Sequence, residues 1–194
     1  MTAKILRNIL LLALPFCSAP VFAHAGHSLL EGGLVNGLLH PLLGLDHLVA
    51  LIAIGVWSGL LAPAAWRWFL PLMLLGLLAG TVAGLMGTPV PGVETGILLS
   101  ILVVGLLMAA MVRLPAWGAA LICGAFMVFH GAAHGLEMQP GVDALAYVIG
   151  LVLTSAAVVM AGHGLGLAVR GVGRPVGRFA GVGFLLVGGV LLLT

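Results

Sequence analysis

The chain has 194 residues, of which 62% are hydrophobic and only 6% carry a formal charge. A soluble chain carries about 25% charged residues, so this composition, with a mean hydropathy of +1.31, excludes an ordinary soluble enzyme or binding module. The net charge of +2 comes from scattered residues without a basic patch, and no nucleotide-binding loop is present, so neither nucleic acid nor nucleotide is expected as a partner.

Residues 1–23 have the pattern of a cleavable signal peptide. Two basic residues and a short apolar core (9–16) precede small residues at the −3 and −1 positions of a cleavage site after Ala23. His24 would then be the mature N-terminus. An uncleaved first span is the alternative, and it leaves the orientation of the later spans unchanged. Cleavage leaves Cys123 as the only cysteine, which rules out an intrachain disulfide and a thiolate metal cage.

A short helix is expected between the signal and the first long apolar stretch. Ser28 and Glu31 have the spacing of a capping box, which predicts a helix over about 29–39. Pro41 disfavours continuing that helix through His40. A broken helix is tolerated at membrane depth only where it is buried in protein or lines a cavity. Discontinuous helices of this kind often form the ion sites of transporters.

The rest of the chain consists of apolar stretches that reach the roughly 20 residues needed to cross a bilayer. Proline- and glycine-rich breaks separate them. The sequence therefore predicts an all-α, polytopic membrane protein in which residues 24–194 form a single transmembrane helical domain. The six expected spans are about 44–61, 68–86, 95–112, 116–136, 143–168 and 177–194.

The charged residues of the connections fix the expected orientation. If the signal exports the N-terminus, every arginine after the signal falls in an inside connection and every acid of a connection falls outside, as the positive-inside rule requires. Both termini of the processed chain are then outside. The inside residues are Arg67, Arg113, Arg170, Arg174 and Arg178, and the outside residues are Glu94, Glu137 and Asp143.

The fourth span carries the more specific of two histidine clusters. His130, His134 and Glu137 are spaced so that all three lie on one face of a helix. Two imidazoles one turn apart can bind one metal ion, and a carboxylate a turn later can ligate it or orient a histidine. The alternative is a histidine pair hydrogen-bonded between helices beside a solvated Glu137. Gly131 and Gly135 leave the adjacent surface bare, so another helix or an ion can come close.

The second cluster, His40, Asp46 and His47, lies at the outer end of the first span. His40 and His47 share one face if the helix is continuous. Asp46 falls in the first turn of the long span, where complementing the helix dipole is its alternative role. Ionisable groups near a membrane interior cost roughly 2.5–3.5 kcal/mol each. Two such clusters at one depth therefore predict a single metal site that opens to the outside.

Three further histidines are weaker candidates for metal binding. His163 lies toward the inside in the fifth span, where it could be an exit ligand, with a satisfied interior histidine as the alternative. His24 and His27 would lie beside the free amine after cleavage and could capture metal weakly. A flexible polar tail is the alternative interpretation of that segment.

The two motifs resemble those of the HupE/UreJ family of nickel/cobalt permeases. That family carries His-x5-Asp-His at its first span and Phe-His-Gly-x-[Ala/Val]-His-Gly-x-Glu near its fourth. Both are present here without departure, the first from His40 to His47 and the second over residues 129–137. The resemblance extends from the signal to the last span. It implies uptake of Ni²⁺, or of Co²⁺, across a bacterial inner membrane to supply hydrogenase, urease or cobalamin pathways.

The expected function is that of a secondary permease or facilitator, which is not an enzyme and holds no resident cofactor. Its partners are the divalent transition-metal ion and the lipid bilayer, and a homo-oligomer is left open. The main alternative is an intramembrane metallohydrolase with Zn²⁺ on the histidines and Glu137 or Asp46 as the base. A metal-binding accessory or sensor subunit is the second alternative.

Overall fold

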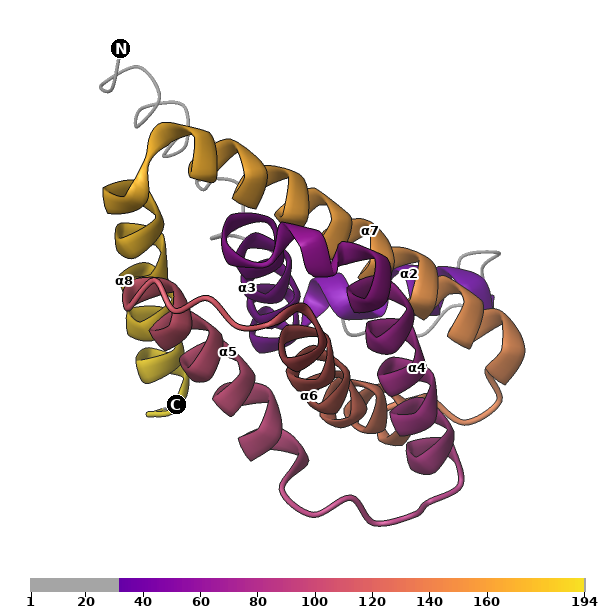
Figure 1. Cartoon of the computed structure of the whole chain (residues 1–194). Helices are drawn as coiled ribbons and strands as arrows, with labels where there is room; N and C mark the ends of the chain where they lie inside the picture. The colour runs from indigo at the N-terminus through magenta and orange to yellow at the C-terminus, as the bar shows by residue number, and fades with distance from the viewer. Residues whose placement is uncertain (1–31, 194) are drawn as a thin grey trace.

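The computed structural model describes residues 32–193, and every regular element in that range is helical (Figure 1). The expected signal peptide (1–23), the capping box (Ser28 and Glu31) and the histidines His24 and His27 lie outside the described residues. The elements are α2 (Gly33–Leu43), α3 (Leu45–Leu61), the 3-10 turn η3 (Pro63–Ala65), α4 (Trp66–Leu85), α5 (Val93–Ala109), α6 (Ala116–Leu136), α7 (Ala144–Val172) and α8 (Arg174–Leu191).

Contrary to the expectation from the sequence, helix α2 does not end before His40. It continues through His40 and Pro41 to Leu43, and the break falls at Gly44, where the axis of α2 turns by 78° into α3. The expectation that Pro41 would stop the helix near residue 39 is therefore wrong. Because Pro41 lies in the last turn of α2, it removes only one backbone hydrogen bond from the helix.

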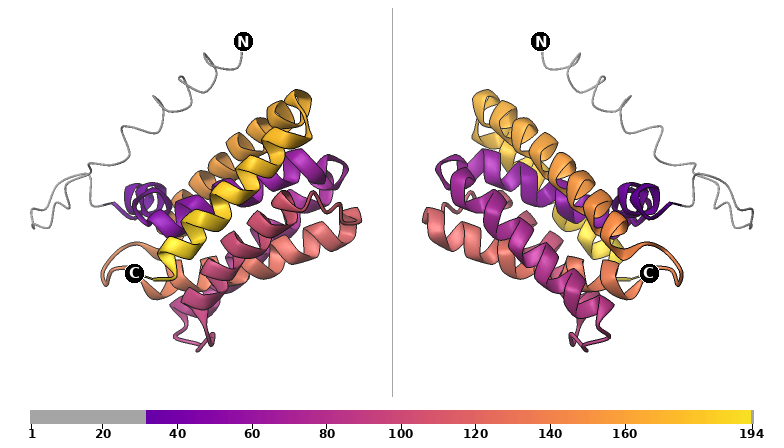
Figure 2. Two further views of the ribbon diagram at one scale, coloured as in Figure 1. Left: turned by 90° about the vertical axis from the view of Figure 1, so that its left-hand side faces the viewer. Right: turned by 90° about the vertical axis from the view of Figure 1, so that its right-hand side faces the viewer.

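Packing against α7 explains why α2 stays helical across Pro41. Gly37 lies so close to the backbone of α7 that a Cβ atom there would collide with the Tyr147 carbonyl group. About two turns farther along α7, the Thr154 hydroxyl donates a hydrogen bond to the Leu38 carbonyl oxygen at 2.8 Å. These contacts oppose the proline penalty of about 3 kcal/mol. The result is a short helix that lies across one end of the bundle (Figure 2).

The described helices are those of a membrane protein. Four of them, α4 together with η3, α6, α7 and α8, are long and apolar enough to cross a bilayer. The bent pair α2–α3 makes a fifth span if the two helices are counted together, and α5 is an apolar helix of 17 residues. Each of the six expected ranges is occupied by one helix, although six complete crossings remain a prediction.

Helices α4 and α6 pack with their backbones in contact. Glycines at every fourth position of α4, Gly76, Gly80 and Gly84, face the backbone of α6. From the other side, a Cβ atom at Gly131 would collide with the Leu77 carbonyl oxygen. Small residues allow such close approach of helices in a membrane. The sequence left open whether another helix or an ion comes close to the bare surface at Gly131. In the structure, helix α4 covers this surface.

The core is centred on α3, which α7 crosses on one side (Figure 1). Its largest buried side chain, Trp57, packs near Phe69 of α4, with a ring-centroid distance of 6.1 Å. The junction of α2 and α3, the end of α6 and the start of α7 lie at the same end of the bundle (Figure 2). This packing brings both histidine motifs to one place.

Candidate metal-binding site

Four imidazoles from three helices meet at this end of the bundle. The His134 ring of α6 lies 4.9 Å from the His40 ring of α2 and 4.6 Å from the His47 ring of α3, measured between centroids. The His130 ring lies 5.5 Å from that of His47. We call these four residues the histidine cluster. The bend at Gly44, and not a continuous helix, directs both His40 and His47 toward His134.

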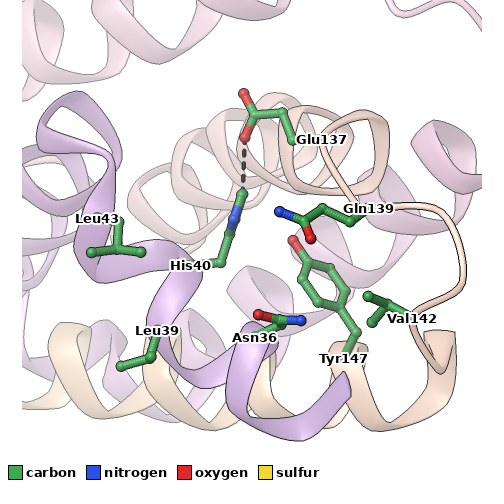
Figure 3. A pocket seen from close by; sticks show the side chains of 8 residues that line it. All are labelled: Asn36, Leu39, His40, Leu43, Glu137, Gln139, Val142 and Tyr147. Carbon is green, nitrogen blue, oxygen red and sulfur yellow. Dashed lines mark hydrogen bonds and ion pairs between the residues drawn. The ribbon is translucent and has the colours of Figure 1, made fainter. Parts of the chain in front are cut away.

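Glu137, the residue that follows α6, completes the outer side of the cluster. The His40 Nε2–H group donates a hydrogen bond to the Glu137 Oε2 atom at 2.9 Å (Figure 3). One ligand atom each from His40, His134 and Glu137 lie within 4.8 Å of one another. An ion about 2 Å from each donor needs donors no more than about 4 Å apart. Small side-chain rotations are therefore enough to bring the three donors onto one ion.

Two hydrogen bonds fix the tautomers of the deeper histidines. The Nδ1 atom of His47 lies 3.0 Å from the Asp46 Oδ1 atom, and that of His130 lies 3.1 Å from the Phe126 carbonyl oxygen. Because a carboxylate and a carbonyl oxygen only accept, both Nδ1 atoms carry the proton and both Nε2 atoms keep a lone pair. Asp46 thus orients His47, which is the usual arrangement behind a metal-ligating histidine.

The inward-facing nitrogens of the cluster have no hydrogen-bond partner among residues 32–193. These atoms are Nε2 of His47, Nε2 of His130 and both ring nitrogens of His134, and all four are buried. A buried polar atom left unpaired costs about 1–3 kcal/mol. Several such atoms around one point are therefore hard to explain by packing alone, whereas a bound cation would satisfy the lone pairs among them.

Exposure is graded from the surface into the cluster. The side chains of Glu137 and His40 are 46% and 28% exposed, whereas that of His47 is 6% exposed, and His134 and His130 are buried. The hydrogen bond from His40 lowers the pKa of the Glu137 carboxyl below its ordinary value of 4.5, so Glu137 is an anion at neutral pH. A cation arriving from the surface therefore meets a carboxylate first and imidazoles afterwards.

Two residues that the sequence analysis did not assign to the site also belong to it. Glu94, in the first turn of α5, lines a cavity of about 160 Å³ together with Asp46, His47, His134 and Glu137. From the sequence alone, Glu94 is expected only as an outside charge. That expectation already places the Glu94 carboxylate at the same depth as both motifs, and this signal could have assigned Glu94 to the site.

Tyr147 of α7 is the second residue that the sequence analysis missed. Its buried hydroxyl donates a hydrogen bond to the His134 carbonyl oxygen at 3.0 Å, and its ring centroid lies 5.8 Å from that of His40. It also lines a second cavity of about 150 Å³, which His40, Glu137 and Gln139 share (Figure 3). No spacing pattern marks a tyrosine that acts through a backbone carbonyl group, so its part in the site was visible only in the fold.

His163 does not join the histidine cluster. It lies on α7, where its Nδ1 atom is 2.8 Å from the Ser58 Oγ atom and its ring stacks on that of Trp66 at 3.9 Å. Eleven residues of α3 separate His47 from Ser58, which corresponds to about 16 Å along the helix. The structure therefore separates His163 from the six stronger candidates, which it brings together. His24 and His27 lie outside the described residues.

Comparisons with known proteins agree with the motifs. Residues 11–191 match the family described as HupE / UreJ protein. The chain is 37% identical over 195 residues to the curated Protein HupE of Rhizobium leguminosarum bv. viciae, and the alignment covers 98% of each chain. No solved structure matches the chain.

Proposed function

Because the chain belongs to the HupE/UreJ family, we propose that it is a secondary permease or facilitator that imports Ni²⁺, or Co²⁺, across the bacterial inner membrane. The observation that carries the proposal is the convergence of four imidazoles and a carboxylate around buried, unpartnered nitrogens. Imidazole and carboxylate are ligands suited to borderline divalent transition metals. The ion is the transported substrate and not a resident cofactor.

The first step that we propose is exchange of the hydrogen bond between His40 and Glu137 for metal–ligand bonds. This bond lies at the exposed edge of the cluster, where both side chains line the two outer cavities. An arriving dication binds the Glu137 carboxylate and His40, and the His40 ring then presents a lone pair to the ion. The water shell of the ion is replaced stepwise by His134, His47 and His130 as the ion moves inward.

The proposal includes the six-span topology with both termini of the processed chain in the periplasm. Helix α5 has 17 residues, which corresponds to about 26 Å, close to the 30 Å hydrocarbon core. The membrane potential then drives uptake. Each charge that crosses 100 mV gains about 2.3 kcal/mol, so a dication gains about twice that. At about 1.4 kcal/mol per tenfold change, this supports accumulation on the order of a thousandfold.

The proposal is tested by uptake of radiolabelled nickel into cells that lack other nickel importers. We compare the wild-type chain, His130→Ala, an empty vector and the matched control Trp117→Ala, which changes an exposed side chain on the same helix. All are compared at equal membrane expression. Uptake should exceed the vector for wild type and Trp117→Ala and should be lost in His130→Ala. Wild-type uptake equal to the vector despite good expression would refute nickel permeation by this chain alone.

The purified chain and vesicles that contain it distinguish the permease from the two alternatives, a zinc hydrolase and an accessory or sensor subunit. An intramembrane zinc hydrolase should retain tightly bound zinc through purification, because its metal is part of the catalyst. An accessory or sensor subunit should bind nickel in vesicles without moving it to the interior. A permease should bind the ion with only moderate affinity, because a site that holds a cation as a closed cage would not release it.

A further inference from the structure

A second group of side chains lies near the inner end of α3, away from the histidine cluster. It consists of Ser58 in the last turn of α3, Trp66 at the start of α4 and His163 of α7, and we call it the inner group. Along α7, sixteen residues separate Tyr147, which contacts the outer site, from His163, a distance of about 24 Å. His163 is the one imidazole of residues 32–193 outside the histidine cluster.

The hydrogen bonds of the inner group assign the tautomer of His163. The Ser58 hydroxyl donates its one proton to the Gly55 carbonyl oxygen at 2.7 Å. The Ser58 oxygen therefore accepts the hydrogen bond from His163, whose Nδ1 atom lies 2.8 Å away. The His163 Nε2 atom keeps its lone pair, and no hydrogen bond within the described residues occupies it. A histidine whose other ring N–H is held in this way is oriented as metal-ligating histidines are.

Two contacts hold the ring in place. The Trp66 ring stacks on it with a centroid distance of 3.9 Å and an interplanar angle of 26°. The backbone at His163 is also fixed, because Gly59 approaches α7 so closely that a Cβ atom there would collide with the His163 carbonyl oxygen. The imidazole is therefore preorganised, although it is partly exposed and contributes little to the apolar core.

The surroundings of the inner group favour a cation. Helix α3 ends at Leu61, and its last turn has the negative end of the helix dipole. Within that turn, the Gly59 carbonyl oxygen has no helical donor four residues later, because that position is Pro63 and proline has no N–H group. The nearby cation Arg67 is exposed and lies over the Trp68 ring at 5.7 Å.

From these contacts we propose that His163 Nε2 is the ligand of a second, inner metal station. It transiently binds the same divalent transition-metal ion on its way from the histidine cluster to the inside. This inference rests on the proposed function, because it assigns a further step to the same ion. A single imidazole binds more weakly than four imidazoles with a carboxylate, so the inner station can accept the ion and release it.

Chemical footprinting tests binding at His163 without relying on transport. The full chain carrying His130→Ala and His134→Ala, which weakens outer binding, is treated with diethylpyrocarbonate in the presence and absence of NiCl₂. Modification of the native His163 is then measured by mass spectrometry. We expect Ni²⁺ to slow its modification at least threefold and Mg²⁺ to leave it unchanged. An equal rate with and without Ni²⁺, or no modification of His163 without metal, would overturn the proposal.

Transport kinetics in proteoliposomes test the role of the inner station. His163→Ala should lower the maximal nickel uptake rate at least fivefold while the KM, set by the outer site, stays within twofold. His163→Cys, which restores a metal ligand, should retain at least half of the rate. Met160→Ala, an exposed position on the same helix, is the matched control and should transport like wild type. A wild-type rate in His163→Ala would overturn the proposed role.

The two experiments together separate this inference from the proposed function. If Ni²⁺ protects His163 but the wild-type chain does not transport nickel, the permease proposal fails and the inner site stands. If the wild-type chain transports nickel but His163 is neither protected nor needed, the inner station fails and the permease proposal stands. Should His163→Ala not fold, the footprint on the native residue decides.

Discussion

Replacing Gly131 by alanine should loosen the contact that holds His130 in position. The Cβ atom added at residue 131 would lie 2.7 Å from the Thr81 backbone nitrogen, and the Leu77 carbonyl oxygen is closer still. Ordinary van der Waals contact begins near 3.4 Å, so α4 and α6 must separate by at least 0.7 Å. The clashing atoms belong to the backbone and cannot rotate away.

The size of the effect follows from comparison with an open glycine. Alanine gains about 1 kcal/mol over glycine inside a helix, and Gly183→Ala on α8 should show this gain because nothing lies within 4 Å of its added Cβ atom. Gly131→Ala has the same gain but adds overpacking, which costs about 1–3 kcal/mol. The difference between the two variants isolates the packing cost. At about 2–4 °C per kcal/mol for a chain of this size, it corresponds to about 2–12 °C.

Thermal unfolding in detergent and nickel uptake measure the two consequences of Gly131→Ala. The variant should melt below Gly183→Ala by that margin. Its KM for nickel should rise at least tenfold, since metal–ligand distances tolerate only about 0.2 Å of error, while Gly183→Ala keeps the wild-type KM. If Gly131→Ala melts with Gly183→Ala and transports like wild type, the backbone contact between α4 and α6 does not position His130.

Three other perturbations test the outer site. Nickel uptake should fall as the pH is lowered from 7.5 to 4.5, because protons compete with the metal ion for the imidazole nitrogens. Glu137 does not contribute in this window, because its lowered pKa keeps it charged until the pH falls below 4.5; flat uptake would contradict histidine ligation. Glu94→Gln should raise the KM severalfold in the uptake assay with little change in melting temperature, and an unchanged KM would exclude Glu94 from the site. Tyr147→Phe should cost about 1 kcal/mol, seen as lower thermal stability, and unchanged stability would mean that its hydrogen bond to His134 is dispensable.

The sequence was sufficient to predict that the two histidine motifs lie together, because this prediction depends on only two physical rules, the periodicity of a helix and the charges of the loops. The spacing of His130 and His134 places them on one helix face, and loop charges place both motifs at one depth. The expected fourth range, 116–136, agrees with the bounds of α6. Regular helices and charge asymmetry were therefore sufficient to find the cluster.

The parts that the sequence did not predict depend on contacts between distant residues. Helix α2 continues past Pro41 because Thr154 and Tyr147, more than 100 residues later, support its last turns. The orienting role of Asp46 follows from the direction of one hydrogen bond, which a pattern of residue types does not contain. Glu94 joined the site because the α4–α5 connection returns it to the same end of the bundle.

The unpartnered nitrogens of the histidine cluster lower the stability of the folded protein, although the proposed function requires them. The four buried nitrogen atoms that lack a partner among the described residues each cost about 1–3 kcal/mol, a local defect that apolar side chains of similar size would remove. Selection for a more stable chain would therefore act against the cluster, as it does at many functional sites. Under the proposed function, the ion that relieves this defect must also leave it, and each transport cycle would restore the defect for the next ion.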